Sequence, residues 1–342
     1  MLKTISSNHE FVLSRLPACV FLALALVGCH SDSKDRARVA NSPETQARVK
    51  ALVDKTLGQM VFVEGGGFWL GDFGELMDDH AKKHNIPPGP DAKPGDNLPF
   101  SIGEDNKPPK WVTLDSFHIQ KFKVTYDDFD VYVAANGLPP HPPLGDETFQ
   151  RVWQSARTRG DIPAGVNWYQ AKGYCQWLGK VTGLPFDLPT EAQWEYAASN
   201  RTNSYRHPYP TDTGLLREGQ THPGFEQKEK LIGNGSLYPV GLFAPNGLGL
   251  HDLVGNGFDW VNDWYAEDAY QSGPTHNPQG PNNGSEKVLR GKAPNEDWID
   301  GFPHLDRYRK RPDAYVSKSG KIYAFSEEGF RCVINKPTSS LP

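Results

Sequence analysis

Cysteine is scarce in this chain, with 4 among 342 residues, and neither sign of charge is in large excess. Lys and Arg number 36 against 41 Asp and Glu, which gives a formal net charge of −5 at pH 7. Nucleic-acid binding needs a basic face for the phosphates, so this balance argues against a nucleic-acid partner. Beyond the N-terminal segment, no apolar run reaches the roughly 18 residues that a membrane-spanning helix requires.

Glycine and proline, in contrast, are abundant, at 34 and 29 residues. This content favours a turn-rich chain over a helical bundle. Aromatic residues make up 11% of the chain and include nine Trp, which argues against disorder over the whole length. The pattern along the chain predicts an α+β fold with few helices and many short irregular strands.

The clearest local signals are helix starts, each marked by a Ser, Thr or Asn before an apolar periodic segment. The four capping residues are Ser42, Thr125, Asn167 and Thr190. We expect strands over residues 60–71, 112–124 and 330–334, and short strands separated by Asn-Gly pairs between 238 and 290. Residues 74–110, 138–162 and 200–235 are predicted to be loops.

The first 29 residues have the pattern of a bacterial lipoprotein signal peptide. Lys3 and Arg15 precede an almost wholly apolar segment, residues 16–27, and the small residue Gly28 precedes Cys29. We expect cleavage after residue 28 and acylation of Cys29, whose acyl chains would anchor the protein to a membrane. No Asp follows Cys29 directly, which resembles the sorting signal of outer-membrane lipoproteins that face the periplasm. A plain secretory signal that happens to contain Cys29 is the alternative.

Removal of a signal peptide at 1–28 leaves a tether with a short helix at 29–58 and one domain at 59–337. Cys175 and Cys332 are then the remaining thiols. Two thiols in an oxidising compartment most often pair, so we predict a Cys175–Cys332 disulfide. A catalytic thiol is the competing interpretation.

Four groups of segments occur in an order that resembles the formylglycine-generating enzyme family, also called the FGE-sulfatase or sulfatase-modifying factor family. They are residues 61–71 with 112–125, 166–177 with LPTEAQWEYAA at 188–198, 245–260 with GLHDLVGNGFDW, and VLRG at 288–291 with GFRC at 329–332. The resemblance covers essentially everything after residue 58. It implies a C-type-lectin-like α+β fold.

The copper-binding cysteine pair of that family has no counterpart here. The family pattern C-x-R-Y-R-C resembles residues 305–310, and Leu305 and Lys310 stand at the two cysteine positions. Neither side chain ligates copper(I), for which thiolates are the natural ligands. The resemblance also places Cys175 and Cys332 at the structural disulfide of the family. We therefore expect neither copper nor formylglycine-generating activity.

A calcium loop of the family resembles residues 252–259. Asp252 and Asp259 would supply carboxylate oxygens, and Gly255 and Gly257 backbone carbonyls, to a structural calcium ion. Asp259 replaces the usual Glu of the family and is one methylene shorter. A tight turn without metal is the alternative.

A cluster of basic residues lies where the family would have its active-site groove. Its members are His304, Arg307, Arg309, Lys310 and Arg311. Such a cluster suits an acidic partner or a phosphate, and an ordinary charged rim is the alternative.

Together these features favour a binding protein on a scaffold that has lost its catalytic residues. Lipoprotein members of the family resemble proteins found beside type VI secretion lipase effectors. The sharpest hypothesis is therefore a periplasmic immunity protein that neutralises a secreted phospholipase. The alternatives are a metal-dependent oxidase or tailoring enzyme with altered chemistry, and an envelope protein that binds carbohydrate or acts as a scaffold.

Overall fold

The computed structural model describes residues 34–76, 97–101, 103–139, 160–201, 209–232, 237–291, 304–313, 315–316, 322–323 and 327–341. Its named helices are α2 (Pro43–Gly58), α4 (Tyr126–Ala135), α6 (Trp168–Thr182), α7 (Glu191–Ala198) and α8 (Phe225–Ile232). Residues 34–40 form a further helical segment. No helix in these ranges is both long and apolar enough to cross a membrane. The predicted signal peptide and lipidation site at Cys29 lie outside the described residues.

Two four-stranded sheets form the centre of the described fold. The first has the order β1 (Met60–Val63), β6 (Phe117–Gln120), β14 (Val333–Ile334) and β7 (Phe186–Asp187). The second has the order β10 (Tyr308–Lys310), β9 (Lys287–Arg290), β8 (Phe258–Trp264) and β13 (Glu328–Gly329). All neighbours pair antiparallel except β13 and β8, which are parallel.

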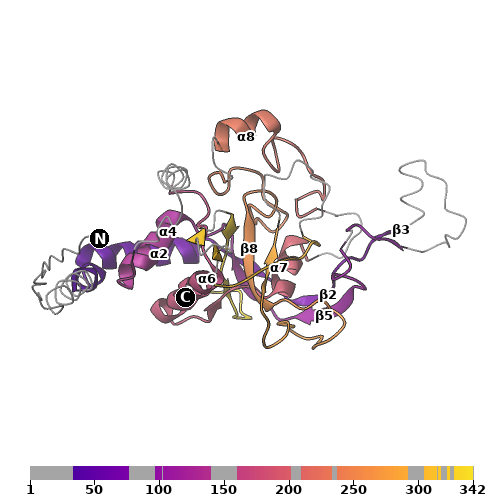
Figure 1. Cartoon of the computed structure of the whole chain (residues 1–342), viewed down its shortest axis with the longest axis horizontal. Coiled ribbons are helices and arrows are strands. Elements are labelled where there is room, and N and C mark those ends of the chain that lie inside the picture. The colour runs from indigo at the N-terminus through magenta and orange to yellow at the C-terminus, as the bar shows by residue number, and fades with distance from the viewer. Residues whose placement is uncertain are drawn as a thin grey trace, which may run out of the picture.

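Three strand pairs complete the described part of the chain. They are β2 (Gly66–Leu70) with β5 (Lys110–Leu114), β3 (Glu75–Leu76) with β4 (Asn97–Leu98), and β11 (Tyr315–Val316) with β12 (Ile322–Tyr323). Figure 1 shows α2 and α4 at one end of the molecule, and β2, β5 and β3 toward the other. The mixture of helices and many short strands confirms the α+β fold class.

The four predicted helix starts are confirmed. The side chains of Ser42, Thr125, Asn167 and Thr190 each accept a hydrogen bond from a backbone amide in the first turn of the helix that follows. Asn167 and Thr190 belong to complete capping boxes, because the side chains of Gln170 and Gln193 accept a hydrogen bond from the backbone amides of these two caps. These ends were predictable because a cap depends on residues three positions apart.

Other elements differ from the prediction. Residues 60–71 form two strands that belong to different sheets, since β1 pairs with β6 and β2 pairs with β5. Gly65 lies between them, where a Cβ atom would collide with the backbone of Leu114. Residues 200–235 were predicted to be a loop, but they contain helix α8. This helix starts directly after Gly224 and has no Ser, Thr or Asn cap that would mark it in the sequence. Between 238 and 257 the chain forms turns, and the first strand of that region begins at Phe258.

The core consists of two apolar clusters. One joins α2, α4 and α6 and includes Phe129, Tyr174 and Phe330, whose rings lie within 6.4 Å of one another. Val49 and Leu52 of α2 belong to the same cluster, so this helix packs on the domain. The second cluster lies between β2, β5, β9 and α7. Burial of α7 between sheets is what places charged side chains inside the protein.

Candidate functional site

Helix α7 carries two carboxylates into the interior of the protein. Glu191 and Glu195 are only 3% and 2% exposed, and they lie one turn apart on the same face of the helix. Buried carboxylates are stable only with charged or hydrogen-bonding partners. Their charged partners come from segments about 100 residues further along the chain, and the Gly71 backbone amide donates to Glu195 Oε1 at 2.7 Å.

Two arginines neutralise these carboxylates. Arg290 places Nη1 2.7 Å from Glu191 Oε1 and Nη2 2.8 Å from Glu195 Oε2. Arg307 places Nε 2.8 Å from the same Glu191 oxygen, and the Tyr270 hydroxyl donates to that oxygen at 3.0 Å. The planar guanidinium suits such multiple contacts better than an ammonium group. We call Glu191, Glu195, Arg290, Arg307 and Tyr270 the Glu191 network.

The pKa values of the two carboxyl groups in this network shift in opposite directions. Burial raises the pKa of Glu191, but Arg307 and Arg290 outweigh burial and hold that pKa below its usual value. Burial raises the pKa of Glu195 to about 7, because Arg290 offsets only part of the lost hydration. The network therefore holds two Arg and two Glu in mutual contact inside the fold.

His304 is part of the same interior and is fully buried. Its backbone carbonyl accepts a hydrogen bond from Arg290, whereas neither ring nitrogen has a hydrogen-bond partner among the described residues. Burial, and then the charge of Arg290, lower the pKa of His304 to about 3. The imidazole is therefore neutral at pH 7. The prediction that His304 and Arg307 belong to a surface for a partner is wrong, because both side chains are buried.

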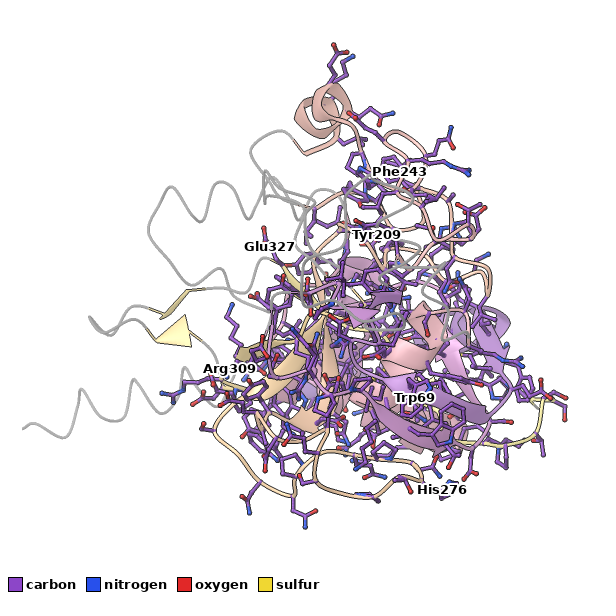
Figure 2. The ribbon with its side chains drawn as sticks, turned by 90° about the vertical axis from the view of Figure 1, so that its right-hand side faces the viewer. Trp69, Tyr209, Phe243, His276, Arg309 and Glu327 are labelled. Carbon is purple, nitrogen blue, oxygen red and sulfur yellow. A yellow bond between two sulfur atoms is a disulfide. The ribbon has the colours of Figure 1, made fainter. Side chains whose placement is uncertain are left out.

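The other three members of the predicted basic cluster carry acidic neighbours. Arg309 is 51% exposed, lies 4.4 Å from the Tyr265 ring and places Nε 3.3 Å from Glu286. Lys310 forms an ion pair with Glu328. Arg311 is 72% exposed and lies 3.1 Å from Asp313. Figure 2 shows Arg309 at the rim of the molecule.

The two positions that would hold the family's cysteines do not fit copper(I). Leu305 is fully buried, and Lys310 has its ammonium group at Glu328. Cys175 and Cys332 form a disulfide with a Cα–Cα distance of 5.6 Å, so the described residues contain no free thiol. A catalytic thiol acts as its thiolate, which a disulfide does not provide.

The predicted calcium loop does not fit calcium either. Asp259 is fully buried, and its Oδ2 lies 3.0 Å from Lys123 Nζ and 3.1 Å from Arg331 Nε. The Trp194 indole N–H donates to the same oxygen at 3.0 Å. Two positive charges at this carboxylate repel a divalent cation and take its place. We call Asp259, Lys123, Arg331 and Trp194 the Asp259 network.

The remaining members of that loop have structural partners. Asp252 accepts hydrogen bonds from the Gly241 amide and the Asn256 side chain, at 2.9 and 3.0 Å. Gly255 and Gly257 have φ angles of +71° and +78°, which favour glycine. A Cβ at Gly257 would also collide with the backbone of Glu327. The turn therefore explains the two glycines without a metal ion.

Lys123 and Arg331 were missed by the sequence interpretation. Each lies between two apolar residues in a strand-like segment, FKV around Lys123 and FRC around Arg331. A charge inside such a segment is a signal for a buried ion pair. The partner is not visible from that signal, because Asp259 lies far from both residues in sequence.

Comparison with known proteins agrees with this geometry. The family model for the sulfatase-modifying factor enzyme 1-like domain, FGE-sulfatase, matches residues 45–336. The formylglycine-generating enzyme of Bos taurus is 26% identical over 303 residues, covering 72% of this chain and 77% of that protein. The inactive C-alpha-formylglycine-generating enzyme 2 of Bos taurus is 31% identical over 173 residues, covering 49% and 48%.

A solved structure shows the same fold. The structure of PvdO from Pseudomonas aeruginosa has a TM-score of 0.56 and 23% sequence identity, covering 81% of this chain and 94% of that one. The family match spans more than four-fifths of the sequence, from α2 to the last strand. The chain therefore belongs to the FGE-sulfatase family.

Proposed function

We propose that this protein is a non-catalytic binding protein of the bacterial envelope, and that its partner is a secreted phospholipase of a type VI secretion system. The observation that carries the non-catalytic part is the chemistry at the cysteine positions. Leu305 is buried where one thiolate would be needed, and Lys310 pairs with Glu328 where the other would be. The family also includes a relative whose name describes it as inactive, so the scaffold persists without the activity.

The charged interior supports a structural role for residues that might otherwise act on a substrate. The Arg307 guanidinium donates to Glu191, and the Arg331 guanidinium donates to Asp259. His304 is neutral and buried. These groups are occupied within the scaffold, and loops carried on such a scaffold suit recognition of a partner.

The exposed part of the basic cluster is the surface that we assign to an acidic region of the partner. Arg309 and Arg311 are both more than half exposed, and Tyr265 lies beneath Arg309. Arg and Tyr are residue types that dominate binding energy at protein interfaces. The predicted lipid anchor at Cys29 would hold this surface in the compartment that a periplasmic toxin enters.

Affinity purification of the tagged full chain from its own cells tests this proposal. We expect a secreted phospholipase in stoichiometric amount, and we expect the purified chain to inhibit that enzyme on lipid vesicles. Arg309→Glu with Arg311→Glu should weaken inhibition about tenfold or more. Arg48→Glu with Lys50→Glu, on the exposed face of α2, is the matched control and should not.

Two results would contradict the proposal. If the phospholipase is produced but is neither captured nor inhibited, the partner assignment is wrong. If the chain supplied with copper(I) converts a cysteine peptide to formylglycine, the non-catalytic assignment is wrong, since that reaction needs the thiolates that Leu305 and Lys310 replace.

A further inference from the structure

A polar pocket lies between the end of β5, the start of α7 and the segments around Asn277 and Asn335. Its volume is ≈ 250 Å³, which is smaller than the roughly 300 Å³ at which pockets for drug-sized ligands begin. Seven of the nine described residues that line it have polar side chains, and none of the nine is Lys or Arg. The pocket therefore suits a small, polar ligand without negative charge.

The walls of this pocket are held by hydrogen bonds within the protein. The Asn277 amide donates to Asp115 Oδ2 at 2.8 Å, and the Asp115 backbone amide donates back to Asn277 Oδ1 at 2.9 Å. On the other side, the Gln193 amide donates to Asn335 Oδ1 at 2.8 Å. These bonds fix the side chains before a ligand arrives, which lowers the entropy cost of binding.

Several polar atoms of the lining keep hydrogen-bonding capacity for a ligand. The hydroxyl oxygens of Ser116 and Thr190 accept from backbone amides, so each O–H is left to donate. Among the described residues, Asp115 Oδ1 makes no hydrogen bond and lies 3.6 Å from the His276 ring. The Gln279 side chain is exposed and makes no hydrogen bond within the described residues, so its amide can both donate and accept.

An exposed tryptophan pair lies on the neighbouring sheet. Trp69 and Trp111 are opposite each other in the β2–β5 register, with ring centroids 5.3 Å apart, and they are 44% and 46% exposed. Gly67 makes room for the Trp111 ring, because a Cβ there would collide with it. Two adjacent exposed indoles form an apolar surface patch that is a candidate for ligand contact.

The tryptophan pair and one wall of the pocket, at Asp115 and Asn277, lie on the same side of β5. Side chains alternate along a strand, so Trp111 and Thr113 point to the same side of β5, and Asp115 follows directly beyond its end. Thr113 Oγ1 lies 3.1 Å from His276 Nδ1, which links the strand to the segment that carries Asn277 and Gln279. Figure 2 shows Trp69 and His276 in the same lower part of the molecule.

We propose that this pocket binds one unit of a neutral saccharide, with Trp69 and Trp111 contacting a unit further along a trisaccharide or longer chain. A sugar hydroxyl both donates and accepts, which matches a carboxylate acceptor beside hydroxyl and amide groups. An anionic ligand would need the Arg or Lys that the lining lacks. The apolar C–H face of a sugar ring suits an exposed indole. This site goes beyond the proposed phospholipase partner and does not depend on it.

Binding of the purified full chain to neutral and acidic oligosaccharides tests the inference. The probes are chitotriose, cellotriose and maltotriose as neutral trimers, with sialyllactose and inorganic phosphate as anions, each measured by titration calorimetry. We expect at least one neutral trimer to bind, and the anions not to bind. Failure of all three neutral trimers, or preference for an anion, would overturn the proposal.

Variants locate the binding. Gln279→Ala and Asp115→Asn should each weaken the trimer about tenfold, whereas Gln220→Ala, a matched exposed amide in another loop, should not. Trp111→Ala should weaken the trimer more than its monosaccharide, and the exposed aromatic control Tyr169→Ala should change neither. Equal effects of pocket and control variants would place binding elsewhere and overturn the assignment.

Discussion

Lys123 and Asp259 form an ion pair in which neither side chain is exposed to solvent, with Nζ 3.0 Å from Oδ2. Burial lowers the pKa of Lys123 to about 8, although Asp259 acts against this shift. Arg331 shares the carboxylate, so one anion serves two buried cations. The pair connects the segment after β6 to β8, and it takes the place that the sequence suggested for a metal ion.

The two partners of this pair should differ in their contribution to stability. Lys123→Met leaves Asp259 with Arg331, so we expect a loss of about 1 to 3 kcal/mol in the free energy of unfolding. Asp259→Asn leaves two buried cations without their anion, so we expect about 3 to 5 kcal/mol. Urea denaturation measures both, with the exposed Lys50→Met as control. A larger loss in Lys123→Met than in Asp259→Asn would contradict the shared-anion arrangement.

Calcium should not stabilise the protein through the loop at 252–259. A ligand that binds only the folded state raises the melting temperature with its concentration. Because Lys123 and Arg331 occupy Asp259, we expect the same melting temperature in calcium and in EDTA. A rise with calcium that disappears in Asp252→Asn would restore the metal assignment.

His304 should make the protein sensitive to acid. Its pKa in the fold is about 3, below the ordinary value of 6.5. Between these two values His304 is protonated in the unfolded chain and neutral in the folded chain. The stability that this group contributes is present above pH 6.5 and is lost as pH falls toward 3. At pH 5 the loss is about 2 kcal/mol relative to pH 7.

Substitution of His304 isolates this effect. In His304→Leu the fall in unfolding free energy between pH 7 and pH 5 should shrink by that amount, as followed by urea denaturation at both values. The exposed, non-titrating Leu242→Ala is the control and should keep the wild-type pH dependence. An unchanged pH dependence in His304→Leu would show that the imidazole is not the responsible group.

The disulfide should contribute substantially to stability. Cys175 and Cys332 are 157 residues apart, and the chain-entropy model assigns a loop of that length about 5 kcal/mol. We expect Cys175→Ala with Cys332→Ala to lower the unfolding free energy by about 2 to 5 kcal/mol. Cys175→Ala alone should expose one thiol to a thiol reagent after unfolding. Unchanged stability of the double variant would contradict a structural role.

The basic cluster illustrates where sequence interpretation failed. His304 to Arg311 read as one surface, because the cations are close together in sequence. In the fold these cations do not share one surface. Arg307 is buried because it binds Glu191, which lies 116 residues earlier in the chain. Charge density along a chain does not reveal the location of the opposite charge, so burial of Arg307 was not predictable from its neighbours.

The sequence by itself determined the family, the α+β class, the four helix starts and the absence of the cysteines at 305 and 310. Each of these depends on short segments, or on chemistry that a single residue type either has or lacks. Only the tertiary structure decided which charges are buried together, as in the Glu191 and Asp259 networks, and which indoles stand side by side. The free energy of a buried charge depends on partners from distant segments, and folding alone brings those segments together.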